Sequence, residues 1–319
     1  MQNIKKYLPQ LQIICFIDDN RIRNNEDVEG LKVLSLQEVM EQESDFTIII
    51  TNYYVSSVLA KIEAKGFDLN KVFFWSQFLI EDVDHSYLIK NKDNLYRAYD
   101  CLEDYLSKMI FENMVTARFD KNIDLLGRTC EKEQYFPDDI FILGNEEVFV
   151  DAGAYDGDTI DTFLKHTKQK YKYIYAFEPD KTNYERLLTR EYSQNIKVYN
   201  AGLYCETGEM NFGSNRGGSS KIEEDGIDIV QVIKFDDLEL PEDRVSFIKM
   251  DIEGSELNAL QGMQETIKKN KPKLAICIYH KFEDLWELPL YIKSLVPEYK
   301  LYIRNYTSYL DEIVLYAVI

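Results

Sequence analysis

The chain has 319 residues, of which 45% are hydrophobic and 29% are charged, and its formal net charge is −19. This length accommodates two domains and a substantial core. The negative charge argues against a surface for nucleic acid or for anionic membranes, because both require a basic face. Five scattered cysteines fit reduced thiols rather than a disulfide framework or a zinc site. With no signal-peptide pattern and no apolar run of membrane-spanning length, we expect a cytoplasmic protein.

Residues 1–80 are predicted to form a small, incomplete Rossmann-like α/β unit. A nucleotide-binding unit would begin with a strand and a glycine loop, yet no glycine precedes Gly30. Asp18 and Asp19 follow the first predicted strand and would hold a ribose in an intact unit. A truncated N-terminus and a structural or dimerising half-domain are the alternatives. The predicted elements are a strand over 13–17, a helix over 35–41 that begins with a capping box at Ser35 and Glu38, a strand over 46–51, a helix over 56–65 and a strand over 72–75.

Residues 81–140 differ in character from the unit before them. Apolar side chains between Tyr87 and Ile110 recur near helical spacing, which predicts one or two helices. Phe136, Pro137 and Asp138 indicate a turn. We therefore interpret this region as a helical linker that leads into a second domain over 141–319.

The second domain opens with the run V-F-V-D-A-G-A-Y-D-G-D at residues 148–158. Its pattern predicts a buried strand, a tight turn at Gly153 and Gly157, and a helix. This arrangement directs free backbone N–H groups and the positive end of a helix dipole towards the carboxyl edge of the strand. Ligands bind at that edge in open α/β sheets.

The next predicted strand, over 173–177, ends at Glu178, and Pro179 disfavours helix at that residue. An acid at this strand tip can accept hydrogen bonds from both ribose hydroxyls. The dinucleotide fingerprint G-x-G-x-x-G is absent, however. The spacing from Asp151 looks like the D-x-G-x-x-x-G motif of class I S-adenosylmethionine (SAM) methyltransferases, and an acid-rich mouth suits the cationic sulfonium of SAM.

The rest of the domain alternates strands and helices, which predicts a doubly wound parallel sheet. Parallel strand tips share one edge, so we expect one cleft to gather five side chains: Asp151, Glu178, Asp251, Glu253 and His280. The predicted elements are strands over 196–200, 208–212, 230–235, 245–250, 274–279, 299–303 and 313–318, helices over 183–190, 255–268 and 285–295, and a polar loop over 213–220.

From about residue 148 onward the chain resembles the FkbM-type SAM-dependent methyltransferases. The resemblance rests on V-F-V-D-A-G-A-Y-D-G-D-T, on A-F-E-P-D and above all on F-I-K-M-D-I-E-G-S-E-L-N-A-L-Q-G. It covers just over half of the chain and not the N-terminal unit. It implies a class I methyltransferase sheet with an antiparallel last strand, SAM as cofactor, and O-methylation of a sugar or polyketide hydroxyl.

The resemblance also implies roles for individual residues. Asp151 and Gly153 would form the SAM-binding turn, Glu178 would hold the ribose, and Asp251 and Glu253 would face the site of methyl transfer. The other residues expected at the cofactor are Asp158 and Thr159 at the start of the helix, Asn200 and Ala201 near the adenine, and Asp251, with the loop over 215–220 as a cover.

A hydroxyl is a poor nucleophile, so a base should take its proton during attack. His280 is the candidate because imidazole titrates nearest neutral pH, and Asp251 or Glu253 could do this instead or orient His280. A structural histidine, or acids that only cap a helix, are the alternatives. A divalent metal held by these three residues is possible but not favoured, and we assign no metal ligands.

The sequence alone leaves the acceptor, the partners and the competing functions open. We expect a small-molecule or glycan acceptor, no nucleic-acid or membrane partner, and possibly a homodimer through the N-terminal unit or the linker. A non-catalytic scaffold with a SAM-binding fold and a nucleotide-dependent oxidoreductase are the competing functions.

Overall fold

The computed structural model describes residues 10–19, 27–51, 55–74, 85–120, 126–190, 192–213, 221–222, 228–242, 244–307 and 310–319. The chain divides into two compact units, Met1–Gln77 and Phe78–Ile319. Each unit is described by itself. Among the described residues, no helix is long and apolar enough to cross a membrane.

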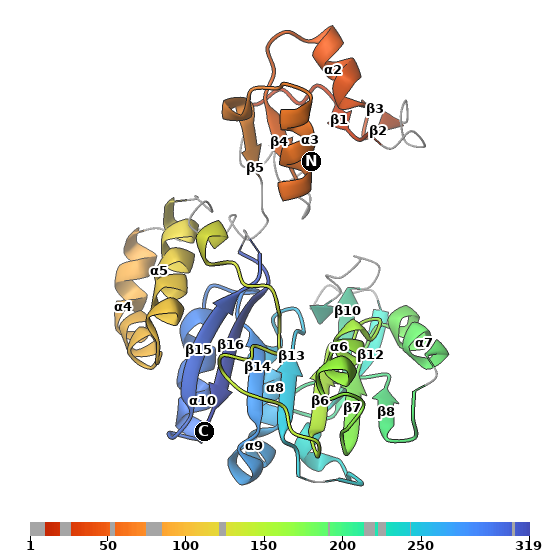
Figure 1. The fold of residues 1–319 in the computed structure, drawn as a ribbon, viewed down its shortest axis with the longest axis vertical. Helices are drawn as coiled ribbons and strands as arrows, with labels where there is room; N and C mark the ends of the chain where they lie inside the picture. Colours follow the sequence, from red (N-terminus) through yellow and green to blue (C-terminus); the bar gives the residue numbers. More distant parts are fainter. Residues whose placement is uncertain are drawn as a thin grey trace. The chain divides into compact units, whose positions relative to one another are not determined.

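The described residues of the first unit form short strands and the helices α2 and α3 (Figure 1). The predicted capping box is confirmed, since Ser35 and Glu38 bond reciprocally at the start of α2. Asp19 also accepts a hydrogen bond from the Leu36 N–H at 3.0 Å, so this tip acid supports α2. The end of the predicted strand at Trp75 lies outside the described residues. The elements are β1 (Phe16–Ile17), β2 (Asp27–Val28), β3 (Leu31–Leu34), α2 (Leu36–Gln42), β4 (Ile48–Ile50), α3 (Val55–Ala64), η1 (Leu69–Lys71) and β5 (Val72–Phe74), with β1–β3 and β4–β5 parallel and β2–β3 antiparallel.

The second unit contains a seven-stranded sheet in the order β15-β16-β14-β13-β6-β7-β8. Strands β14, β13, β6, β7 and β8 run parallel, whereas β16 is antiparallel to both of its neighbours. The start of β16 therefore lies at the same edge as the ends of the parallel strands. The strands are β6 (Val148–Ala152), β7 (Tyr173–Phe177), β8 (Ile196–Tyr199), β13 (Phe247–Met250), β14 (Lys273–Cys277), β15 (Lys300–Asn305) and β16 (Ile313–Val318).

Helices cover the sheet, and a second, four-stranded sheet with the order β11-β10-β12-β9 lies in the same unit. The core is rich in aromatic rings: Phe149 stacks on Phe163 of α6 and on Phe247 of β13, with ring centroids 4.6 and 5.1 Å apart. The remaining elements are α6 (Asp158–His166), α7 (Lys181–Thr189), β9 (Gly202–Leu203), β10 (Gly208–Gly213), β11 (Lys221–Ile222), β12 (Asp228–Ile233), η5 (Phe235–Asp237), α8 (Glu256–Gly262), α9 (Gln264–Asn270) and α10 (Asp284–Leu295).

The region expected to be a linker forms α4 (His85–Asp100), α5 (Tyr105–Asp120) and η3 (Leu126–Thr129), and it packs on the methyltransferase-like sheet. Helix α4 lies against α10 and α5 against β15, as Figure 1 shows. Fully buried Arg118 of α5 donates to the Tyr279 carbonyl at 2.8 Å. Arg304 of β15 bonds Asp104 and Asp139 at 2.8 and 2.6 Å. These contacts join the two helices to the sheet as one unit.

Candidate active site

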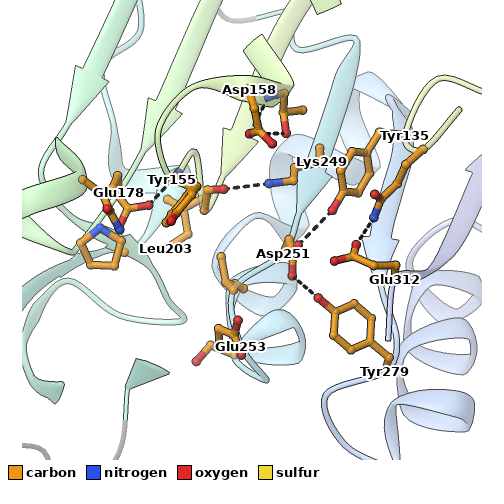
Figure 2. A pocket seen from close by; sticks show the side chains of 18 of the residues that line it. Tyr135, Tyr155, Asp158, Glu178, Leu203, Lys249, Asp251, Glu253, Tyr279 and Glu312 are labelled. Atoms are coloured by element: carbon orange, nitrogen blue, oxygen red, sulfur yellow. Dashed lines mark hydrogen bonds between the residues drawn. The ribbon is translucent and has the colours of Figure 1, made fainter. Parts of the chain in front are cut away.

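A pocket opens at the carboxyl edge of the seven-stranded sheet, where β6, β7, β13 and β14 end and β16 begins (Figure 2). Six of the residues expected at the site line it: Gly153, Asp158, Thr159, Glu178, Asp251 and Glu253. Glu178 lies on one side of Asp251 and Glu312 on the other, as Figure 2 shows. This order agrees with the order of the strands in the sheet, in which β13 lies between β7 and β16.

The glycine turn after β6 is shaped by close packing. Gly153 has a φ of +77°, and a Cβ added there would lie 1.9 Å from the Asp251 carbonyl oxygen. The N–H groups of Gly153 and Ala154 both donate to the Phe177 carbonyl at 3.0 Å, so they tie the turn to β7. These two N–H groups are therefore not among the free backbone donors that the sequence analysis expected at this edge. Glycine is required here because both its φ and its contact distance exclude a side chain.

The carboxylate of Glu178, at the end of β7, accepts two backbone hydrogen bonds. The Tyr155 N–H donates to Oε2 at 2.8 Å, and the Asp180 N–H donates to Oε1 at 2.9 Å. Burial raises the pKa of Glu178 to about 7, although these two hydrogen bonds act to lower it. A carboxylate has about four lone-pair positions, so each oxygen can accept one further hydrogen bond.

Asp151 and Lys249 form a buried ion pair beneath the glycine turn. Lys249 Nζ lies 3.1 Å from Asp151 Oδ1 and donates to the Gly153 carbonyl at 2.8 Å. Burial raises the pKa of Asp151 to about 6, even though Lys249 acts to lower it. Burial opposes the charged form of Lys249 as well, but Asp151 and Asp251 raise its pKa. Asp151 is fully buried, so it lies beneath the pocket and does not line it.

Asp251 occupies the middle of the pocket and has a 23% exposed side chain. Tyr135 donates its hydroxyl to Oδ2 at 2.9 Å, and Tyr279 donates to Oδ1 at 3.1 Å. Burial disfavours the carboxylate, yet His280, Lys249 and the two tyrosines hold the pKa of Asp251 below its usual range. Asp251 is therefore an ionised group near neutral pH.

His280 lies among three carboxylates and does not line the pocket. Its Nδ1 is 3.0 Å from Glu256 Oε1, and its Nε2 is 3.4 Å from Asp251 Oδ1 and 3.6 Å from Glu253 Oε2. Burial would lower the pKa of His280, but these carboxylates raise it to about 10. The expected role as a general base does not fit, because an imidazolium has no lone pair to accept a proton.

Asp251, Glu256 and His280 are also the one group of possible metal ligands within the described parts of the chain. One ligand atom from each lies within 4.8 Å of the others. However, each ring nitrogen of His280 faces a carboxylate. A protonated histidine offers no lone pair to a metal ion, so we assign no metal site to this cluster.

Two residues expected near an adenine do not line the pocket. The Asn200 amide donates to the Glu178 and Pro179 carbonyls at 3.0 and 3.2 Å, so it braces the chain behind Glu178. Ala201 is buried, and the next two residues, Gly202 and Leu203, line the pocket instead. The loop over 215–220 lies outside the described residues.

The pocket residues that the sequence analysis missed include Tyr135, Lys249, Tyr279 and Glu312. Lys249 lies within the F-I-K-M-D-I-E-G run, and Tyr279 directly precedes His280, so both were adjacent to recognised signals. Tyr135 and Glu312 precede β6 and β16, and no motif singles them out.

The sheet is that of a class I methyltransferase fold, with a pocket at the carboxyl ends of parallel strands and an antiparallel strand near the sheet's edge. Residues 151–309 match the model of the methyltransferase FkbM domain, so this part of the chain belongs to the FkbM methyltransferase family. Both the predicted family and the predicted fold class are thereby confirmed.

Comparison with solved structures supports the fold over nearly the whole chain. A methyltransferase FkbM from Methylobacillus flagellatus KT is similar at 24% identity and a TM-score of 0.76, covering 96% of this chain and 84% of its own. An rRNA methylase from Streptococcus thermophilus matches at 17% identity and a TM-score of 0.35, covering 55% of this chain and 87% of its own. The comparison with curated proteins gives no significant match.

Proposed function

We propose that this chain is a SAM-dependent O-methyltransferase that acts on a hydroxyl of a sugar, glycan or polyketide-like small molecule. The observation that carries the proposal is one pocket in which Gly153, Glu178 and Asp251 follow three adjacent strands. Membership of the FkbM methyltransferase family supports the reaction class.

The hydrogen-bond acceptors and the negative charge of the pocket fit SAM. Glu178 retains an acceptor position on each oxygen, which suits the two ribose hydroxyls. The lining includes Asp158, Asp251 and Glu253, so its charge favours a cationic ligand over a pyrophosphate. When bound, SAM supplies a methyl group on a positively charged sulfur.

The chain's own residues would bind and orient the reactants. Asp251, ionised and fixed by Tyr135 and Tyr279, presents a fixed negative charge in the middle of the pocket. We propose that His280 positions Asp251 and Glu253 from behind by remaining protonated. Such orientation alone supplies roughly 7–11 kcal/mol in the best cases of intramolecular reactions.

Calorimetric titration of SAM, S-adenosylhomocysteine (SAH) and NAD tests this proposal. We expect the protein to bind SAM and SAH but not NAD, with EDTA present. Glu178→Ala should weaken SAH binding by about 2–4 kcal/mol, because it removes the charged acceptor of two hydrogen bonds. Glu185→Ala, which removes a largely exposed acid on α7, is the matched control and should bind as the wild type does.

A folded protein that binds neither SAM nor SAH would refute the methyltransferase proposal. Binding of NAD in place of SAH would support the oxidoreductase alternative. SAH binding that survives Glu178→Ala unchanged would remove the ribose role of Glu178 while leaving the reaction class intact.

A further inference from the structure

We propose that Glu312 is the residue that accepts the proton of the acceptor hydroxyl, and that Gln134, Tyr135 and Tyr279 form the acceptor subsite with it. This inference rests on the proposed methyltransferase function. It assigns the proton transfer to a residue of the β15–β16 hairpin that the sequence motifs do not mark.

The order of strands along the pocket edge carries the first step of the argument. Glu178 follows β7, Gly153 follows β6, Asp251 follows β13, Tyr279 comes two residues after β14, and Glu312 precedes β16. Neighbouring strands lie about 4.8 Å apart, so Glu178 and Glu312 are each about two strand spacings from Asp251, on opposite sides. With the ribose at Glu178, the far side of Asp251 is the part of the pocket left for the acceptor, and Glu312 lies there (Figure 2).

Three other acids of the pocket, Asp251, Glu253 and Asp158, already contact neighbouring polar groups. Asp251 accepts both tyrosine hydroxyls and is held ionised by adjacent cations. Glu253 lies 3.6 Å from the ring of protonated His280. Asp158 accepts the Thr159 N–H at 2.7 Å at the start of α6. The lowered pKa of Asp251 makes it a weak base, and Glu253 and Asp158 each already face a neighbouring group.

Glu312 has a different environment. The Gln134 amide donates to its Oε2, and Oε1 has no hydrogen-bond partner among the described residues. Burial and the nearby charge of Asp251 raise the pKa of Glu312 to about 7, against the opposing effects of Gln134 and Lys249. A base whose pKa lies near the working pH is well matched to proton transfer.

The proposed step balances without another reactant. The acceptor oxygen forms a bond to the methyl carbon while the carbon–sulfur bond breaks, and that bonding pair stays on sulfur to give a neutral thioether. The hydroxyl proton moves to Glu312, which becomes a neutral carboxylic acid and later releases the proton to water.

The same residues restrict the class of acceptor. This side of the pocket presents two carboxyl groups, two tyrosine hydroxyls and one amide, all of which form hydrogen bonds. Phosphate or carboxylate groups would be repelled by Asp251 and Glu312. The subsite therefore fits a neutral or cationic polyhydroxy compound.

A ratio of two affinities tests the position of Glu312 without a known acceptor. Sinefungin resembles SAH but has a carbon that carries an amino group where SAM has the sulfur that carries the methyl group, so it places a cation at the transfer position. We expect wild type at pH 8 to prefer sinefungin over SAH, and Glu312→Gln to reduce that preference about tenfold. SAH affinity itself should stay within about twofold, because Glu178 holds the ribose in both proteins.

Asp311→Asn is the matched control, because Asp311 is the adjacent acid but does not line the pocket and bonds Thr307 instead. It should keep the wild-type ratio. An unchanged ratio in folded Glu312→Gln, or an equal loss in Asp311→Asn, overturns the proposal. Thermal unfolding confirms that each variant is folded, and Glu312→Asp supplies a second variant that retains the charge and should retain most of the preference.

The pH dependence gives an independent readout. The groups that face Glu312 are Asp251 and Lys249 from β13, Cys277 and Tyr279 at β14, Asp311 beside it, and Gln134 and Tyr135 before β6. In wild type the preference for sinefungin should rise as pH increases through about 7, and in Glu312→Gln it should stay flat. Because both ligands share the ribose, titration of Glu178 cancels in the ratio.

The outcome separates this inference from the function on which it rests. If neither SAH nor sinefungin binds, the cofactor proposal fails first. If both bind but the ratio ignores Glu312 and pH, the cofactor proposal stands and the role of Glu312 is rejected.

Discussion

Asp251, Glu178 and Glu312 are three carboxyl groups of one pocket with three different sets of neighbours. Cations and two tyrosine hydroxyls hold the pKa of Asp251 below its usual range. Burial outweighs backbone hydrogen bonds at Glu178 and raises its pKa to about 7, and burial with the charge of Asp251 does the same at Glu312. Asp251 therefore stays charged when the other two begin to bind protons.

Glu178 should make SAH binding pH-dependent. The ribose hydroxyls require the carboxylate, and the pKa of Glu178 is about 7 before the ligand binds. SAH affinity should be constant above about pH 8 and fall towards tenfold per pH unit below 7, a slope measurable by calorimetry. Glu178→Gln should bind more weakly and lose most of this slope, and an unaltered slope in that variant would assign the titration to another group.

His280 should stabilise the fold most strongly below neutral pH. Its pKa is raised from 6.5 to about 10 in the folded protein, so its contribution is complete below about 6.5 and is lost as pH rises through 10. His280→Gln leaves buried Glu256 without its partner and should cost about 3–5 kcal/mol in the free energy of unfolding at pH 6. Denaturant unfolding from pH 6 to 10 should show the difference shrinking, whereas His85→Gln, an exposed control on α4, should show no such trend.

The turn after β6 and the end of β13 are packed so closely that each determines the other's position. Gly153 contacts the Asp251 backbone, and Lys249 bonds the Gly153 carbonyl from below. The glycine turn and the central acid of the pocket are therefore positioned together.

Gly153→Ala should destroy this arrangement. The new Cβ would lie 1.9 Å from the Asp251 carbonyl oxygen at a φ of +77°. We expect at least about 2 kcal/mol of destabilisation and loss of measurable SAH binding. Gly208→Ala is the control, since nothing lies within 4 Å of its Cβ position. Normal SAH affinity in Gly153→Ala would show that the turn can shift freely.

The sequence predicted features that depend on neighbouring residues better than features that depend on the order of strands in the sheet. The capping box at Ser35 and the strands before Gly153 and Glu178 depend on neighbouring residues, and the sequence predicted them correctly. Tyr135 and Glu312 enter the pocket only because β6 and β16 belong to one sheet with β13 and β14. A single sequence does not contain that order, so neither residue was found. The pocket is lined by Gly202 and Leu203 rather than by the predicted Asn200 and Ala201, a shift of one or two positions at a strand end, where sequence-based boundaries are least certain.

The compact unit that carries the pocket includes the residues that the sequence analysis described as a linker. The predicted boundary at 141 separates Arg118 and Asp139 from the strands they support, whereas the compact unit starts at Phe78. Helices α4 and α5 thus belong to the same compact unit as the pocket.

Two fragments test the extent of this unit. Fragment 78–319 should fold and bind SAH within about threefold of the full chain, because it retains every described contact of the pocket. Fragment 141–319 should unfold at much lower denaturant, since it leaves the buried Arg304 and the Tyr279 carbonyl without their partners. Circular dichroism and calorimetry on both fragments give the answer, and equal stability would restore the boundary at 141.

The antiparallel direction of β16 has a consequence for how this enzyme family can diversify. In the proposed assignment, β6, α6 and β7 build the cofactor side of the pocket, and the segment before β6, the end of β14 and the β15–β16 hairpin build the acceptor side. Mutations in the hairpin can therefore change which compound is methylated while the cofactor turn stays intact. A new substrate preference can evolve, or be engineered, by exchanging one hairpin.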